Sequence, residues 1–473
     1  MRRPAASAIL IPAALAIVGL LVLALWVWGS SVSSLELRVP GQDRPGGATP
    51  EVLDGVAAGG GLVPGKANPP TNLPGAWPSF RGPNRDNIAD AAGPLARSWP
   101  SGGPRVRWSI KLGEGYAGPV VRDGRVYLLD YDEQNSCDAL RCLSLDSGEE
   151  IWRFTYPVAV KWNHGYSRTV PTLVGNYVVS IGPKCHVTCL DATTGKLQWQ
   201  IDLVRQYGAK VPDWYAGQCP LVDRDRDRVI LAPGGKNDLL LAVDLKSGQP
   251  APGWKTPNPR KWKMTHSSIM PMEYKGRRTF VYCGSGGVVG VSAEDGSILW
   301  DTTEWQIKMA TVPSPVCRTD GRIFLCGGYE SGAMMLQIEE RGGAWSVHTK
   351  FRLKPAVFGS TQQTPILFQD HLFGIRQKDK EMVCLDLDGK PVWRSGPQQR
   401  FGDGPYLMAG GLMFLLSEKG VLTLAEATPA GYKPLAQARV LDGQEAWAPL
   451  ALAAGRLLAR DEFRMVCLDV GKN

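Results

Sequence analysis

The sequence predicts an all-β fold, an eight-bladed β-propeller of four-stranded antiparallel blades, preceded by one transmembrane helix. The first observation is a repeat: eight times a proline opens a short apolar run, at intervals of 40 to 52 residues, and a tight-turn signal follows each run. This period is typical of propellers, in which small sheets are arranged as a ring. The repeated residues are Pro119, Pro171, Pro220, Pro271, Pro315, Pro365, Pro405 and Pro449.

The second observation is that one strand pattern recurs within each repeat, most clearly from Tyr166 to Leu203. A proline cannot donate a ladder hydrogen bond, so it suits an inner strand that pairs on one side only. Late in most repeats a tryptophan is expected to wedge against the next blade. In the clearest repeat the expected strands cover 170–174, 177–181, 186–191 and 197–200. The late tryptophans are Trp152, Trp199, Trp254, Trp300, Trp345 and Trp393.

The last two repeats depart from this pattern. The seventh, around Pro405 to Val440, lacks the tryptophan, and the eighth, Trp447 to Asp469, has only three strands before the sequence ends. We expect residues 106–112 to supply the missing strand and to bring Trp108 to the usual tryptophan position beside Cys467. Pairing the two ends would close the ring and remove its open sheet edges.

The N-terminal segment is apolar. After Arg3 no charged residue occurs until Glu36, and Ala5 to Trp28 is long enough for the hydrocarbon core of a bilayer. We expect residues 1–35 to be a signal anchor, a single-pass helix in the cytoplasmic membrane, with the propeller facing the periplasm or exterior. The alternative is a cleaved signal peptide, which usually has a shorter apolar region. Residues 36–76 are rich in proline and glycine and are expected to be a flexible linker, so the propeller domain covers 77–473.

The chain has 473 residues and a formal net charge of +8, and its basic residues are scattered with no run of five. No basic stripe or recognised nucleic-acid module accompanies the charge, so we expect no nucleic-acid partner. The chain contains neither a P-loop nor a G-x-S-x-G elbow, and its five histidines form no metalloprotease motif. The acidic residues beside the repeat turns are interpreted as structural turn residues: Asp146, Asp191, Asp244 and Asp295.

The segment from Cys189 to Trp199 resembles the tryptophan-docking repeat of pyrroloquinoline-quinone-like (PQQ-like) propellers, and weaker copies end at Trp152, Trp300 and Trp393. The resemblance covers about residues 77–473. That superfamily includes quinoprotein alcohol dehydrogenases, the propeller lipoprotein of the outer-membrane assembly machinery, and many exported propellers of unknown role. The segment from Trp77 to Asp86 is similar to the opening segment of planctomycete-type members of that last group.

The resemblance implies two different functions. Quinoprotein dehydrogenases hold calcium beside PQQ, and use an aspartate base and a disulfide between adjacent cysteines. This chain has no Cys-Cys pair and no C-x-x-C-H haem attachment motif. We therefore expect no cofactor and a non-catalytic binding or assembly scaffold. The alternatives are a quinone-dependent alcohol dehydrogenase with PQQ and calcium and, as a third reading, a polysaccharide-binding protein.

The ten cysteines are interpreted mainly as small buried side chains. Cys142, Cys189, Cys384 and Cys467 occupy one equivalent strand position. Cys317 and Cys326 flank a predicted hairpin, and a disulfide between them is left open. The Cys185 to Cys189 cluster lacks zinc-type spacing, so we expect no metal site there.

A binding site, if present, is expected at one mouth of the central channel, ringed by the residues just before each inner-strand proline. The candidates are polar and mixed in charge, which suits an anionic or sugar-like ligand but also a solvated rim. A protein partner or a small ligand would bind on this face. The candidate binding residues are Arg168, His266, Gln218 and Gln362, within a wider rim of Tyr116, His164, Ser267, Thr311, Gln363 and Asp403.

Overall fold

The structure is a computed structural model that describes residues 16–25, 61–67, 73–89 and 93–472. The chain divides into two compact units, residues 1–47 and 48–473. In the first unit, residues 16–25 are helical and carry exposed apolar side chains. Among the described residues, no helix is both long and apolar enough to cross a membrane. The rest of the expected anchor, and the linker at 36–60 and 68–72, lie outside the described residues.

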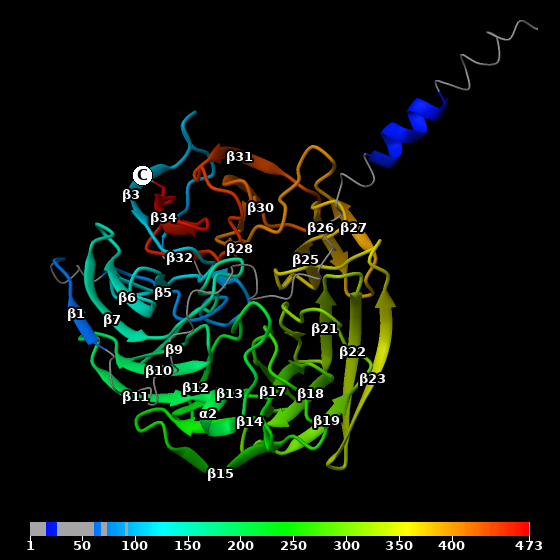
Figure 1. The fold of residues 1–473 in the computed structure, drawn as a ribbon. Helices are drawn as coiled ribbons and strands as arrows, with labels where there is room; N and C mark the ends of the chain where they lie inside the picture. Colours follow the sequence, from blue (N-terminus) through cyan, green and yellow to red (C-terminus); the bar gives the residue numbers. More distant parts are fainter. Residues whose placement is uncertain (1–15, 26–60, 68–72, 90–92, 473) are drawn as a thin grey trace, which may run out of the picture. The chain divides into compact units, whose positions relative to one another are not determined.

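The second unit is a ring of eight antiparallel blades, which confirms the predicted propeller (Figure 1). Blade 1 contains β4 (Val120–Arg122), β5 (Arg125–Asp132), β6 (Cys137–Ser144) and β7 (Glu150–Pro157). Blade 2 contains β8 (Thr172–Val174), β9 (Tyr177–Ile181), β10 (His186–Asp191) and β11 (Leu197–Asp202), followed by the short helix α2 (Leu203–Tyr207). Blade 3 contains β12 (Leu221–Asp223), β13 (Arg228–Leu231), β14 (Asp238–Asp244) and β15 (Pro250–Pro257). Blade 4 contains β16 (Met270–Tyr274), β17 (Arg277–Gly284), β18 (Gly287–Ser292) and β19 (Ile298–Thr302).

The remaining blades follow the same order. Blade 5 contains β20 (Val316–Cys317), β21 (Arg322–Gly327), β22 (Gly332–Arg341) and β23 (Ala344–Leu353). Blade 6 contains β24 (Ile366–Phe368), β25 (His371–Ile375), β26 (Met382–Asp386) and β27 (Pro391–Arg394). Blade 7 contains β28 (Tyr406–Ala409), β29 (Leu412–Leu416), β30 (Val421–Glu426) and β31 (Pro434–Arg439). Blade 8 combines β32 (Ala451–Ala453), β33 (Arg456–Arg460) and β34 (Arg464–Asp469) with β3 (Arg105–Lys111).

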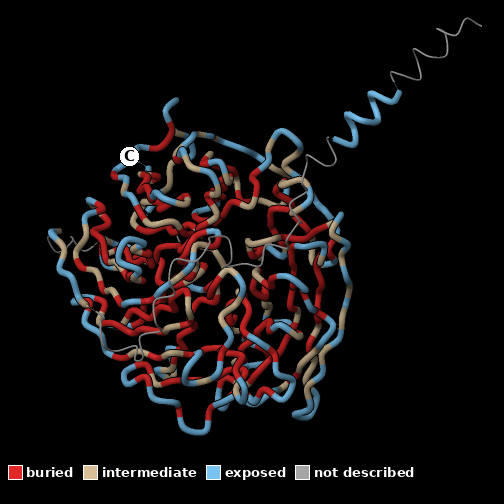
Figure 2. The backbone as a smooth tube through the Cα atoms, viewed as in Figure 1, coloured by how far each residue is buried: buried red, intermediate tan, exposed pale blue. Residues whose placement is uncertain are grey.

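The first strand of each blade faces the channel, since β4 contacts β8 and β32, and β16 contacts β20. The apolar core is divided into clusters whose members come from neighbouring blades, so the buried residues lie mainly between sheets (Figure 2). Two blades carry a fifth strand. β1 (Gly61–Pro64) pairs with the outer edge of β7, so this part of the expected linker is a strand. β2 (Ile88–Ala89) pairs in parallel with the inner strand β28.

The tryptophans dock each blade onto the next one. The ring of Trp199 lies against Gly248, where an added Cβ would be 2.6 Å from the indole, and its Nε1 donates to the carbonyl of Leu245 at 2.8 Å. A glycine is needed there because its φ of 68° and the close indole both disfavour a side chain. The same indole-to-carbonyl bond recurs at four further junctions, from Trp108, Trp152, Trp254 and Trp393.

Blade 5 differs from the prediction in its register. Trp345 lies on β23 as expected, but it pairs with Glu340 near the end of a long hairpin, and its Nε1 has no hydrogen-bond partner. Phe351 instead pairs with Met335 beside the strand irregularity, and its ring lies against Gly389 of blade 6. A phenylalanine therefore takes the docking position, because the hairpin between β22 and β23 is longer than in the other blades.

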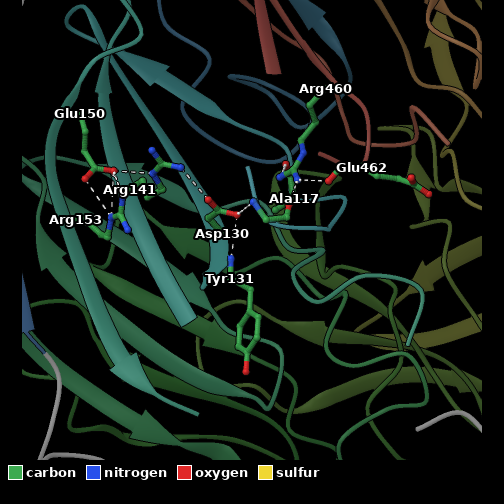
Figure 3. Close-up of polar contacts among 9 residues, drawn as sticks. Ala117, Asp130, Tyr131, Arg141, Glu150, Arg153, Arg460 and Glu462 are labelled. Carbon is green, nitrogen blue, oxygen red and sulfur yellow. Dashed lines mark hydrogen bonds and ion pairs between the residues drawn. The ribbon is translucent and has the colours of Figure 1, made fainter. Parts of the chain in front are cut away.

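The two ends of the domain close the ring as predicted. β3 pairs antiparallel with β34, and Trp108 lies opposite Cys467. Beside this strand pair, a network of polar contacts joins blade 8 to blade 1 (Figure 3). Arg460 of β33 is buried and donates to the carbonyls of Ala117 and Gly113 at 3.2 and 3.1 Å. Asp130 accepts from the Gly113 amide at 2.8 Å and from Arg141 at 2.9 Å.

Candidate functional site

Residues 77–89, here called the plug segment, lie across the central channel. Trp77 exchanges two backbone hydrogen bonds with Val121 of blade 1, and the Leu173 amide of blade 2 donates to the Pro78 carbonyl at 2.7 Å. At its other end the segment forms β2, and Asn87 donates to the Tyr406 carbonyl at 2.9 Å. The segment therefore bonds to inner strands of blades 1, 2 and 7.

Two buried arginines hold the plug segment in place. Arg81 donates to the carbonyls of Thr364 and Pro365 at 2.7 and 2.9 Å, at the entry to the inner strand of blade 6. Arg85 donates to the Pro220 carbonyl of blade 3 at 3.1 Å. Burial lowers the pKa of each guanidinium to about 10, so both stay charged at neutral pH. In the sequence, residues 77–86 indicated only a resemblance to a family. The signal for their structural role was a pair of arginines in a short stretch that contains Gly and Pro.

Against the plug segment lies a cavity of about 390 Å³, which is within the size range of small-molecule sites. The plug segment forms one wall, and the loops before the inner strands form the others. Among the predicted candidates, Arg168, His266 and Gln362 line this cavity. Its lining residues are Phe80, Arg81, Asn87, Tyr116, His164, Arg168, Trp214, Gly217, Cys219, His266, Ala310, Val312, Tyr329, Thr361, Gln362, Gln363, Thr364, Asp403, Trp447 and Pro449.

Gln218 does not line the cavity. Its side chain is fully buried, accepts from the Ala232 amide at 3.0 Å and donates to the Ala232 carbonyl at 3.4 Å. The Gln218 side chain therefore satisfies the backbone groups of Ala232, just after β13. Its chain neighbours Gly217 and Cys219 line the cavity. Ser267 and Thr311 of the wider rim are also buried outside the lining, since side chains on successive loop residues point in different directions.

Arg168 is the cation of the cavity whose hydrogen bonding is incomplete. Its Nη2 donates to the carbonyls of Asn163 and His164 at 2.9 and 2.6 Å, and its guanidinium lies over the Tyr116 ring at 5.5 Å. Its Nη1 is buried and has no hydrogen-bond partner. Burial lowers the pKa of Arg168 to about 10, which leaves it charged at neutral pH. The backbone carbonyls fix the guanidinium, while the buried Nη1 keeps no hydrogen-bond partner.

Two further lining groups supply donors or aromatic faces. The Nε1 of Trp447 is buried without a partner, and its ring is 5.1 Å from that of Tyr116. The Tyr116 hydroxyl bonds to Glu445, and burial together with this carboxylate raises the pKa of Tyr116. Burial and the charge of Arg168 lower the pKa of His266 to about 4, so its imidazole is neutral at neutral pH.

The backbone is strained where it meets the cavity. Three lining residues from different blades have left-handed φ values, namely His164 at 49°, Trp214 at 61° and Tyr329 at 54°. In the plug segment, Arg81 and Asn87 have φ values of 64°. Such conformations cost free energy in residues other than glycine and gather at ligand sites and switch regions. Their convergence on one cavity distinguishes it from the hairpin turns, where left-handed residues serve the turn itself.

The lining offers no activated nucleophile. Burial raises the pKa of the Cys219 thiol, which keeps it protonated, and its sulfur accepts from the Val170 amide at 3.2 Å. The lining carboxylate, Asp403, accepts from Lys380 at 2.7 Å. All ten cysteines lie in the described region and are free thiols, and those at the repeated strand position are buried, as expected. Asp191, Asp244 and Asp295 accept from amides of their own turns, which confirms their structural role.

These residues do not fit a calcium-bound quinone of the dehydrogenase type. Within the described ranges, no group of three or more His, Cys, Asp or Glu side chains is placed to hold a metal ion. Hard cations such as calcium need several oxygen ligands, and the one lining carboxylate is already paired with a lysine. The cavity lining also contains a single thiol, Cys219, where the dehydrogenase pattern uses two adjacent cysteines.

The comparisons with known proteins agree with the fold. A solved structure of BamB from Moraxella catarrhalis superposes with a TM-score of 0.51 at 15% identity, covering 77% of this chain and 99% of that one. A europium-containing methanol dehydrogenase superposes with a TM-score of 0.54 at 13% identity, covering 84% and 89%. At such low identities these likenesses show the fold alone.

Sequence comparison identifies the family. The outer membrane protein assembly factor BamB of Vibrio cholerae serotype O1 is 27% identical over 208 residues, 43% of this chain. The chain spans about half (48%) of the length of that curated relative. The family model described as outer membrane protein assembly factor BamB matches residues 136–388, more than half of the sequence. The chain therefore belongs to this PQQ-like propeller family.

Proposed function

We propose that this protein is an exported, non-catalytic binding scaffold that holds a partner, a protein segment or a small ligand, at the mouth of its closed channel. One observation carries the proposal. The plug segment bonds to blades 3 and 7, on opposite sides of the ring, and forms one wall of a cavity in which two lining side chains, Arg168 and Trp447, have buried donors without partners. Buried donors are normally satisfied, so two unpartnered donors on residues that line one cavity favour a bound acceptor.

The absence of catalysis in this proposal rests on the chemistry of the lining. His266 is neutral because of its lowered pKa and has no carboxylate or nucleophile bonded to its ring among the contacts of the described residues. A general base needs a partner within hydrogen-bond reach, and a nucleophilic cysteine needs a lowered pKa. Cys219 has a raised pKa. The relatives named as assembly factors support an assembly role.

Membrane anchoring is part of the same proposal. The helical residues 16–25 carry large apolar side chains such as Ile17, Leu20 and Leu25, which are 59%, 66% and 67% exposed. Exposed apolar side chains of this density favour burial in a lipid phase. The apolar sequence from Ala5 to Trp28 then gives a single-pass anchor in the cytoplasmic membrane, with the ring on the periplasmic side. Retention of the full chain in washed membranes, with loss of the ring after external protease treatment of spheroplasts, tests this orientation.

Site-specific photo-crosslinking in cells tests the scaffold. A benzoylphenylalanine at Met309, 58% exposed beside the lining residue Ala310, should crosslink a discrete partner. The matched control at Val392, 46% exposed on the outer strand β27, should not. Adding Arg168→Met should remove the Met309 crosslink. Equal crosslinking at both positions, or no effect of Arg168→Met, would contradict binding at this site.

A second experiment tests the alternative function, a quinone-dependent alcohol dehydrogenase. The full chain in nonionic detergent is mixed with PQQ and calcium, and the melting temperature and dye-coupled oxidation of methanol and ethanol are recorded. A ligand that binds only the folded state raises the melting temperature through mass action. We expect neither a shift of several degrees nor turnover. Both together would replace the scaffold by a quinone-dependent alcohol dehydrogenase.

A further inference from the structure

The cavity lining carries two arginines, Arg81 and Arg168, and one carboxylate, Asp403. Arg168 keeps Nη1 unused and Trp447 keeps Nε1 unused, both buried. The lining carboxylate, Asp403, is neutralised by Lys380. Because His266 is uncharged at neutral pH, the positive charges of the lining are those of Arg168 and of Arg81, whose donors bond to backbone carbonyls. A ligand that satisfies these groups needs an anionic acceptor, such as a carboxylate.

The fixed position of Arg168 makes it suited to this role. Two backbone carbonyls and the face of Tyr116 hold the guanidinium, so little side-chain freedom is lost when a ligand binds. Within the described residues, no carboxylate lies within ion-pairing distance of this guanidinium, in contrast to Arg141, which is 2.9 Å from Asp130. Glu114 and Glu445 act on Arg168 only from beyond ion-pairing distance, so the guanidinium, held by carbonyls, is a preorganised anion receptor.

The remaining lining combines ring faces with amide and hydroxyl groups. Phe80, Tyr116, Trp214, Tyr329 and Trp447 provide aromatic surface. The lining also contains the polar side chains of Asn87, Thr361, Gln362 and Gln363. Stacking surfaces interleaved with short polar groups suit a sugar ring, which presents apolar faces and a hydroxyl-bearing edge. A flat aromatic acid would use the faces but leave most of these polar groups without new partners.

Resting on the proposed function, we propose that this cavity binds a uronic acid, a sugar ring that carries a carboxylate, with Arg168 and the Trp447 indole donating to that carboxylate. The volume of about 390 Å³ is near the lower end of small-molecule sites, so it takes one or two rings at the end of a chain. Arg168 and Trp447 are then the residues that select an acidic sugar over a neutral one. The proposal uses no chemical step, because the site binds its ligand unchanged.

Isothermal titration of the full chain in nonionic detergent with D-glucuronate and D-galacturonate tests the proposal. D-glucuronamide has the same ring without the charge, and it should bind at least about tenfold more weakly because charge-assisted hydrogen bonds are lost. Benzoate, a carboxylate on an aromatic ring, should also bind at least about tenfold more weakly. Uronate binding no tighter than that of the amide would overturn the anion assignment, and benzoate binding as tight as glucuronate would overturn the sugar assignment.

Three variants separate the role of the side chains from folding. Arg168→Met should abolish the difference between glucuronate and glucuronamide, whereas Arg341→Met, at an arginine that is 85% exposed, should preserve it. Trp447→Phe keeps an aromatic ring but removes the pyrrole part of the indole with its Nε1–H, so it should weaken glucuronate several-fold, and its melting temperature shows whether the fold is kept. Undiminished uronate binding by Arg168→Met would also overturn the assignment. If uronates fail to bind while the Met309 crosslink persists, this inference fails and the scaffold proposal stands.

Discussion

Asp138 of β6 provides a pH-dependent stability that can be worked out from its surroundings. Its carboxyl is fully buried, accepts from the Tyr156 hydroxyl at 2.6 Å and lies 3.4 Å from the Ser167 hydroxyl. Gly182 packs against it, where an added Cβ would be 2.5 Å from Oδ2. Burial raises the pKa of Asp138 from 3.8 to about 7, with a smaller contribution from Asp130. Below pH 3.8 the carboxyl is neutral in both the folded and the unfolded states.

The sign follows from linkage. As pH rises from about 4 to about 7, the unfolded chain loses this proton before the folded one, so the free energy of unfolding falls. A rise of about three units in the pKa of Asp138 lowers the free energy of unfolding by about 4 kcal/mol above pH 7. The described ring has about 400 residues, and an unfolding entropy of about 2.1 cal/mol/K per residue converts this into about 5 °C. Asp138→Asn keeps an acceptor for Tyr156 and cannot ionise, so it should raise the melting temperature at pH 8 by up to that amount.

The assay is the melting temperature of the full chain in nonionic detergent from pH 4 to pH 8.5, for wild type and Asp138→Asn. Other groups titrate in this range, including Glu462, whose pKa is raised to about 7 by burial and by Glu445. The difference between the two proteins cancels those contributions. It should be near zero or negative at pH 4 and grow through pH 7. A difference that does not change with pH would refute the reasoning.

The remaining predictions concern ring closure and the plug segment. Trp108→Ala should destabilise the ring by about 3–5 kcal/mol in chemical denaturation, and Trp345→Ala by less, because Trp345 has no docking bond. Deleting residues 464–473 removes β34 and should abolish the cooperative melting transition; an unaltered melting curve would contradict closure. Arg81→Ala should cost about 3–5 kcal/mol by leaving inner-strand carbonyls unpaired, whereas Arg97→Ala, at a 56% exposed side chain, should cost less than about 1 kcal/mol. Equal effects of these two arginine variants would contradict the buried role of Arg81.

The repeating parts of the fold were predictable because they depend on local patterns. Turn acids such as Asp191, cysteines such as Cys189 and docking tryptophans such as Trp199 recur in phase, and each residue has its own short-range reason to be there. The closure of the ring was also predictable from the number of strands. The eighth repeat lacked a fourth strand, and the segment before the first repeat carried Trp108 at the usual tryptophan position. The register of blade 5 did not follow, since the tryptophan and the docking position were separated by an extended hairpin.

The candidate site was predictable only in part. The position before each inner-strand proline placed Arg168, His266 and Gln362 in the cavity, but it could not distinguish Gln218, whose amide turns into its own blade. The plug segment escaped prediction because its contacts are remote. Arg81 bonds to a carbonyl 284 positions away, and no periodicity in the sequence reports such a contact. Arg81 and Arg85 bond to backbone carbonyls, which every residue has, so the side chains of the partner residues give no signal in the sequence.

The pairing of β3 with β34 has a consequence for biogenesis. The strands meet across a separation of about 355 residues, so the first strand is synthesised long before its partner. Contacts of this range form slowly, and an unpaired strand is prone to aggregate in the meantime. The edge of β3 therefore lacks its partner until β34 has been synthesised, and it must be kept out of contact with other chains until then. Slow closure of the ring, with a period in which β3 can pair wrongly, follows from this topology.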